Sequence, residues 1–231
     1  MCGRFVLSVS ARRLAGHFGI DLDEELERML KITPRYNISP TQLVPIFRLA
    51  PKDSKPELAN LKWGLLPAWS KDAKAAYHTI NAMAETVDTK PAFRAAFRKR
   101  RCIVPMSGFY EWKRLDEKNK QPNYVHGTSD DLLGVAGLWD HWEREGEIVE
   151  SFTVITTEAN HLMHSLHTRM PVILKPEDYL HWVQAREVDD LKAMLRPCPD
   201  SWLTAHPVSK YVNSPKNEGP ECIAAVSESP S

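Results

Sequence analysis

The chain has 231 residues, of which 42% are hydrophobic and 26% charged, a composition typical of a globular protein. Its 30 basic and 30 acidic residues balance, so net charge gives no support for nucleic-acid binding and any such site must be local. No apolar run reaches the ~18 residues of a membrane span, and the first residues lack the pattern of a secretory signal peptide. The four cysteines show no C-x-x-C spacing, which argues against a disulfide scaffold or a four-cysteine zinc site and predicts a reducing, cytoplasmic compartment.

The first half of the chain alternates strands and short helices. A strand is expected at residues 2–8, and Ser10 can cap a helix from Ala11 to Phe18. Residues 35–41 are interpreted as a loop, because Pro40 disfavours helix in its neighbour. The other elements expected here are an acidic helix at 22–31, strands at 43–50 and 58–64, a loop at 65–74, and a helix at 91–101 with Phe93 and Phe97 on one face.

The second half is richer in strands. β-branched and aromatic residues predict strands at 102–113, 122–127, 132–143, 149–159, 171–174 and 202–209. Helical segments are expected at 160–166, 176–184 and 188–195. Neither a regular βαβ alternation nor a Gly-rich phosphate loop is present. The order predicts an α+β fold with a mixed, mostly antiparallel, β-rich core and flanking helices, in one domain at 2–225 with a flexible tail at 226–231.

Cys2 carries the most distinctive chemistry of the sequence. Initiator Met is commonly removed before a small residue, and removal of Met1 would leave an amine and a thiol on adjacent carbons. With ordinary pKa values of ~7.7–8.0 for the amine and ~8.5 for the thiol, both are partly nucleophilic near neutral pH. The amine can form an imine with an aldehyde, and the thiol can then close a thiazolidine ring. The alternative is a small buried side chain without a chemical role.

Three polar residues could serve such chemistry. Glu111 lies inside the apolar segment GFYEW, where a carboxylate is costly unless it has a partner or an acid/base role; a strand-edge Glu facing water fits equally well. His167 lies two residues before Arg169 and just ahead of a strand, where a structural His is the alternative. Asn37 offers an amide on the 35–41 segment, although Asn in such places usually marks a turn.

A basic cluster precedes the Glu111 segment. It consists of Arg94, Arg98, Lys99, Arg100 and Arg101, and Arg4, Arg12 and Arg13 add charge near the N-terminus. Such runs are usually solvated faces. Their position next to the Glu111 strand nevertheless makes them candidates for attracting phosphate.

Eight segments taken together resemble the SOS-response-associated peptidase (SRAP) family of abasic-site processing proteins, from Cys2 to about Gly219. In chain order they are CGRF, RYNISP, WGLLPAW, INAMAET, SGFYEW, HTRMP, HPVS and VNSPKN. Each fragment alone is weak, but all eight in this order and spacing are highly specific. The resemblance implies the β-rich SRAP fold with a cleft that binds single-stranded DNA and crosslinks covalently to abasic sites. It also implies a self-processing peptidase that exposes Cys2, and a monomer without cofactor, metal or membrane contact.

The resemblance also implies roles for individual residues. Cys2 is the expected nucleophile and Asn37 the residue that orients its amine. Glu111 is expected to act as acid and base in ring opening and imine formation, and His167 to assist sugar opening and the β-elimination of an abasic-site lyase. Arg4, Trp69, Asn81 and Arg169 are the expected DNA-binding residues. Such a protein would be cytoplasmic, associated with the nucleoid in a bacterium, or nuclear in a eukaryote.

Two positions depart from the family pattern. Met83 stands where members often have Arg, so one phosphate contact is expected to be missing. Ser70 follows Trp69 where bacterial members often have a second Trp, so the stacking surface is expected to be smaller.

The sequence leaves three alternative functions. A metal hydrolase would use His161, His164 and His167, but a zinc site needs three or four converging ligands. A non-covalent single-strand binder would have no need of Cys2. An ordinary N-terminal-nucleophile peptidase would cleave added peptides as well as its own Met1.

Overall fold

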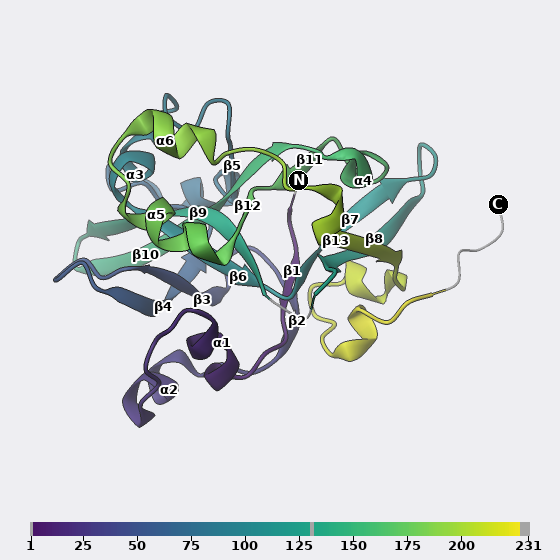
Figure 1. Cartoon of the computed structure of the whole chain (residues 1–231), viewed down its shortest axis with the longest axis horizontal. Helices are drawn as coiled ribbons and strands as arrows, with labels where there is room; N and C mark the ends of the chain where they lie inside the picture. Colours follow the sequence, from purple (N-terminus) through teal and green to yellow (C-terminus); the bar gives the residue numbers. More distant parts are fainter. Residues whose placement is uncertain (1, 130–131, 227–231) are drawn as a thin grey trace.

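The computed structural model describes residues 2–129 and 132–226, which form two β-sheets with short helices around them (Figure 1). The strands of the larger sheet are β3 (Leu43–Leu49), β4 (Pro56–Trp63), β5 (Asn81–Met83), β6 (Arg101–Met106), β9 (Leu133–Arg144), β10 (Glu147–Glu158), β11 (Arg169–Pro171) and β12 (Ile173–Leu174). Those of the smaller sheet are β1 (Phe5–Leu7), β2 (Arg35–Ile38), β7 (Gly108–Arg114), β8 (Lys120–Gly127) and β13 (Leu203–Pro207). This architecture confirms the expected α+β class with a mostly antiparallel core.

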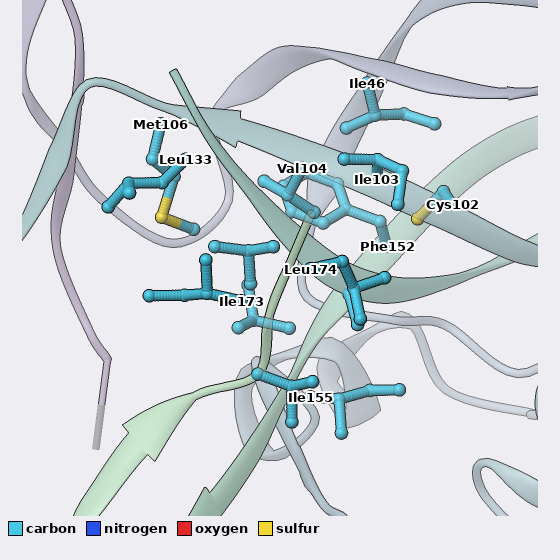
Figure 2. Close-up of a cluster of buried hydrophobic side chains, with 14 of the residues drawn as sticks. Ile46, Cys102, Ile103, Val104, Met106, Leu133, Phe152, Ile155, Ile173 and Leu174 are labelled. Carbon is cyan, nitrogen blue, oxygen red and sulfur yellow. The ribbon is translucent and has the colours of Figure 1, made fainter. Parts of the chain in front are cut away.

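The larger sheet closes into a five-stranded barrel. Its strands follow the order β10-β4-β3-β6-β9, and β9 pairs back onto β10. All of these pairs are antiparallel except β10 with β4. Large apolar side chains fill the core, and Figure 2 shows Ile103, Val104 and Phe152 within one cluster of buried side chains. The three short strands β5, β11 and β12 extend this sheet beyond the barrel.

The smaller sheet is ordered β13-β8-β7-β1-β2 and is antiparallel throughout. Its central strand β7 approaches β8 closely at Gly108, where an added Cβ would lie 2.5 Å from the Tyr124 ring and from the Val125 carbonyl. Glycine is therefore required there. On its other edge β7 pairs with β1, so the strand that follows Cys2 lies beside the strand that carries Glu111.

Helices cover the outside of the barrel. The α-helices are α1 (Ala11–His17), α2 (Glu24–Leu30), α3 (Arg94–Lys99), α4 (His161–His164), α5 (Tyr179–Gln184) and α6 (Val188–Ala193). The 3-10 helices are η1 (Ala73–His78), η2 (Pro176–Asp178), η3 (Asp200–Trp202), η4 (Lys210–Asn213) and η5 (Pro220–Cys222). In Figure 1, α5 and α6 lie on one side of the barrel and α1 and α2 on the other. No helix within 2–129 and 132–226 is long and apolar enough to span a membrane.

Several expected boundaries were wrong. Residues 35–38 form strand β2 rather than a loop, because β1 offers an open edge and Pro40 lies beyond the paired residues. The expected strand at 102–113 is two strands that break at Ser107 and enter different sheets. The expected helix at 91–101 covers only Arg94–Lys99, because Arg101 already pairs with β9.

Other expectations agree with the structure. Ser10 does cap α1, accepting a hydrogen bond from the Arg13 amide, and Phe93 and Phe97 are both buried. At the C-terminus the Val226 amide donates to the Pro207 carbonyl, while the remainder of the expected tail, 227–231, lies outside the described residues.

Candidate active site around Cys2

Cys2 lies on the short segment that precedes β1 and is fully buried. Burial raises the pKa of its thiol well above the ordinary value, and the nearby negative charge of Glu111 raises it further. The thiol therefore stays protonated at neutral pH, and a base must take its proton before it can act as a nucleophile. Met1, whose removal was expected, lies outside the described residues.

Glu111 lies on β7 and is only 3% exposed, which confirms a buried position rather than a strand-edge one. The hydrogen bond from the Tyr110 amide to the Arg4 carbonyl, 3.0 Å long, holds β7 beside the N-terminal segment. A buried carboxylate next to a buried thiol is an arrangement suited to acid/base chemistry.

Asn81 makes the side-chain contact with Cys2. Its Nδ2 donates to the Cys2 carbonyl over 2.9 Å, and β5 holds the residue opposite Val154 of β10. Its Oδ1 is buried and has no hydrogen-bond partner among the described residues. An acceptor in this position is available to a donor on a reacting group, because an unpaired buried oxygen is costly. Sequence analysis had placed Asn81 among the DNA contacts.

Asn37 has a different set of partners. Its Nδ2 donates to the carbonyls of Val212, Ser214 and Asn217 at 2.9–3.2 Å, and its Oδ1 accepts from Arg4. These bonds engage both ends of the amide, so Asn37 fastens the 212–217 segment onto β2. The expected orientation of Cys2 by Asn37 has no counterpart in these contacts, and Asn81 provides the contact instead.

Arg4 fastens the same segment. Its guanidinium donates to the Asn37 side chain and to the Val212 carbonyl, both at 2.8 Å, and to the Asn213 carbonyl at 3.1 Å. It also lies over the Trp112 ring, 5.8 Å from its centroid. A DNA phosphate that binds Arg4 would therefore share a guanidinium that is already hydrogen-bonded to Asn37 and to the 212–213 backbone.

His167 and Arg169 lie between α4 and β11. The Arg169 amide donates to His167 Nδ1 over 3.0 Å, so a neutral His167 ring carries its proton on Nε2. The Arg169 guanidinium forms a bidentate pair with Glu85 at 2.6 and 2.9 Å, and also donates to the Thr156 carbonyl. Strand β10 pairs with β5 at Val154–Thr156 and with β11 at Thr156–Glu158, so it brings the Asn81 and Arg169 segments together.

Trp69 lies on the loop between β4 and β5, and its side chain is 63% exposed. Tyr77 on the same loop is 64% exposed, and Met83 on β5 is partly exposed. Tyr77 was not expected at this surface, because an aromatic residue in a short helical turn gives no signal of exposure in the sequence. The loop thus presents two large aromatic side chains to solvent, a surface suited to stacking.

The basic cluster does not act as a unit. Arg101 is buried and donates to the carbonyls of Phe97, Trp182 and Val183, and burial lowers its pKa to about 10. Arg100 forms an ion pair with Asp140 at 3.0 Å. Two of the five residues expected to attract phosphate therefore serve the fold.

Among residues 2–129 and 132–226, no group of three or more His, Cys, Asp and Glu side chains is arranged to hold a metal ion. The described cysteines are all free. The chemistry available at the site is that of a buried thiol, a buried carboxylate, an amide and, on a neighbouring segment, an imidazole.

The fold and the site define a barrel protein with a buried cysteine at the second position of the chain, beside a buried acid. The chain belongs to the SOS response associated peptidase (SRAP) family, whose model matches residues 1–215. It is 41% identical over 228 residues to the abasic site processing protein YoqW of Bacillus subtilis (strain 168), covering 96% of this chain and 99% of that protein. It is 34% identical over 226 residues to the abasic site processing protein HMCES of Xenopus tropicalis, covering 85% and 67%. Among solved structures, a protein from Bacteroides thetaiotaomicron superposes with a TM-score of 0.86 at 27% identity, covering 97% of this chain and all of that one.

Proposed function

We propose that this protein processes abasic sites in single-stranded DNA by forming a covalent thiazolidine crosslink through Cys2. The observation that carries the proposal is the buried Cys2 with Glu111 beside it and Asn81 bonded to its carbonyl. The names of the relatives, which are abasic site processing proteins, support the choice of substrate. The protein would act as a cytoplasmic, nucleoid-associated or nuclear monomer without a cofactor.

The first step is removal of Met1, which gives Cys2 a free α-amine; the proposal includes self-cleavage at this bond. The amine then attacks the C1′ aldehyde of the ring-opened sugar, and loss of one water gives an imine. Asn81 holds the carbonyl of Cys2 and offers its Oδ1 to the reacting nitrogen, which fixes the amine at the aldehyde. A positioned nucleophile reacts faster because the conformational entropy that positioning costs was already lost when the protein folded.

Ring closure then stabilises the adduct. Glu111 takes the proton of the Cys2 thiol, the sulfur adds to the imine carbon, and the proton passes to the nitrogen. This assignment follows from the raised pKa of the thiol, which needs a base within reach. The reverse sequence would release the DNA, so the same carboxyl would serve reversal.

A lyase reaction can diverge from the imine. Solvent water takes the C2′ proton, a C2′=C3′ double bond forms, and the C3′–O bond breaks, so that the 3′ phosphate leaves and the strand is cleaved. His167, with Nδ1 occupied by the Arg169 amide, presents Nε2–H to the sugar oxygens and would assist both ring opening and this elimination. Arg4, Trp69, Tyr77 and Arg169 would hold the flanking phosphates and bases.

The proposal is tested by incubating the protein with single-stranded DNA that contains one abasic site. A band of protein-linked DNA that survives denaturation is expected for the abasic strand only. Equal retention of undamaged DNA before denaturation, with no surviving band, would instead identify a non-covalent binder. Cleavage of added peptides would identify a general peptidase.

A further inference from the structure

The loop that carries Trp69 is fastened at its backbone. The Leu66 amide donates to Ser151 Oγ and the Ala68 amide to Asp140 Oδ2, at 2.8 and 3.2 Å. The Trp142 indole donates to the Ser70 carbonyl at 2.8 Å, and Arg144 to the Lys71 carbonyl at 2.9 Å. A loop with this many backbone anchors on both sides of one residue has little freedom, although Trp69 itself faces solvent.

The anchors come from one face of one hairpin. Asp140, Trp142 and Arg144 alternate along β9, so their side chains lie on the same face of the strand. Ser151 of β10 is the direct cross-strand partner of Asp140. We call these four side chains the hairpin anchor. The opposite face of the same hairpin carries Glu150, which pairs with Arg48 and does not bond the loop.

Asp140 is the charged member of the hairpin anchor that is most deeply buried, at 3% exposure. Its Oδ1 accepts from the His141 amide at 2.8 Å and pairs with Arg100 at 3.0 Å, which leaves Oδ2 for the Ala68 amide. A buried carboxylate needs such partners, because desolvation of an unpaired charge is costly. Ala68 directly precedes Trp69, so Asp140 fixes the backbone from which the indole projects.

The loop is also joined to the candidate site. The Leu65 amide donates to the Thr79 carbonyl at 3.3 Å, which closes the loop at its base, two residues before Asn81. Asn81 in turn bonds Cys2. Hydrogen bonds thus connect the base of the Trp69 loop to the segment that contacts Cys2. A shift of the Ala68 backbone would move the indole of Trp69 and leave the bond between Asn81 and Cys2 in place.

We propose that Asp140 is a positioning residue for DNA binding, which holds the loop so that Trp69 is pre-placed to stack on a base beside the lesion. This inference rests on the proposed function, because it needs single-stranded DNA as the ligand. A pre-placed aromatic side chain binds more tightly because little ordering entropy is lost on binding. Asp140 thereby controls affinity, while the rate of the chemistry depends on Cys2 and Glu111.

The test uses the full chain, an undamaged single-stranded oligonucleotide for binding, and the matching abasic oligonucleotide for single-turnover crosslinking. Asp140→Asn keeps the shape of the side chain and removes its charge. It should raise the half-saturating DNA concentration as far as Trp69→Ala does, about fivefold to a hundredfold. The crosslinking rate at saturation should change less than about twofold. Glu150→Gln, on the other face of the hairpin, should change neither quantity.

The double variant Asp140→Asn/Trp69→Ala gives the sharpest result. If Asp140 acts through Trp69, the double variant binds no more weakly than Trp69→Ala alone, because the two losses are the same loss. Additive losses, or wild-type binding by Asp140→Asn, would overturn the inference. Trp142→Phe keeps the ring, loses the bond to Ser70 and should weaken binding in the same direction, so it replaces Asp140→Asn if that variant does not fold. If the wild-type protein binds the undamaged strand but never crosslinks the abasic one, the proposed crosslinking is wrong. The comparison of DNA binding by the single and double variants would still test the role of Asp140.

Discussion

The side-chain amide of Asn81 donates to the backbone carbonyl of Cys2 over 2.9 Å. This bond connects β5, which pairs with β10 of the larger sheet, to the segment that leads into β1 of the smaller sheet. Residues 79 positions apart thus meet at the candidate nucleophile. In contrast, the side-chain amide of Asn37 donates to backbone carbonyls of the 212–217 segment. The two asparagines therefore have separable roles.

Asn81→Ala should slow crosslinking by about tenfold to a hundredfold, because Cys2 loses its anchor at the reacting geometry. Its melting temperature should fall less than that of Asn37→Ala, because only one carbonyl loses its donor and the unpaired Asn81 Oδ1 is removed as well. Asn37→Ala should do the opposite: it leaves buried carbonyls unpaired, costs about 1–3 kcal/mol and lowers Tm by roughly 2–4 °C per kcal/mol. Single-turnover rates and thermal melts of both variants decide the matter. A slow but fully stable Asn37→Ala would reverse the assignment.

Cys2→Ser should retain the amine and lose the thiol that closes the ring. We expect an imine that borohydride traps and no adduct that survives denaturation without it. Cys198→Ser, at a buried cysteine of a loop outside the site, is the matched control and should crosslink normally. Intact mass should show loss of Met1 in active protein. A preparation that keeps Met1 and still crosslinks fully would refute the thiazolidine mechanism.

Glu111→Gln keeps the shape of the side chain and removes its proton transfer. Adduct formation and reversal should slow by about 10²–10⁴-fold, while binding of undamaged DNA stays near wild type. The rates are measured on gels between about pH 5 and 9. Glu158→Gln, at an exposed carboxylate at the end of β10, is the control. Wild-type rates and pH profile in Glu111→Gln would make Glu111 a purely structural residue.

His167→Ala should chiefly impair strand cleavage, because the Nε2–H that assists elimination is lost. Crosslink formation should fall less. His164→Ala, at an exposed residue of α4, should cleave and crosslink as wild type does. The measurement is the ratio of cleaved to crosslinked strand with time. An unchanged ratio in His167→Ala would remove this residue from the elimination.

DNA preference should follow the exposed aromatic residues and the cations. Abasic single strands should crosslink faster than the same lesion in a long duplex, whose stacked bases cannot reach Trp69 and Tyr77. Binding should weaken with salt, with a slope of about 0.7 per phosphate contact on single strands, and Arg169→Ala should lower that slope by one contact. Arg186→Ala, at an exposed residue between α5 and α6, should not. Equal rates on both substrates would contradict the single-strand preference.

Much of the fold could be predicted from the sequence because its signals are local. Alternation and β-branched residues indicated nearly every strand, and Ser10 marked the start of α1. Strand β2, the three-residue strand β5 and the break at Ser107 escaped, since pairing partners far along the chain decide all three. The apolar neighbours of Glu111 left a buried carboxylate and a strand-edge one equally open, and the packing of β7 decided for burial.

The sequence by itself determined which residues are chemically distinctive, namely a cysteine next to the initiator Met, a carboxylate in an apolar strand and a His before an Arg. Only the tertiary structure decided which of them meet. In the folded chain Asn81, rather than Asn37, donates a hydrogen bond to Cys2. Arg101 donates to backbone carbonyls, and Asp140 accepts from the loop that carries Trp69. The physical reason is that residue type and periodicity report burial and local conformation, whereas a hydrogen-bond partner across two sheets is fixed by how those sheets pack.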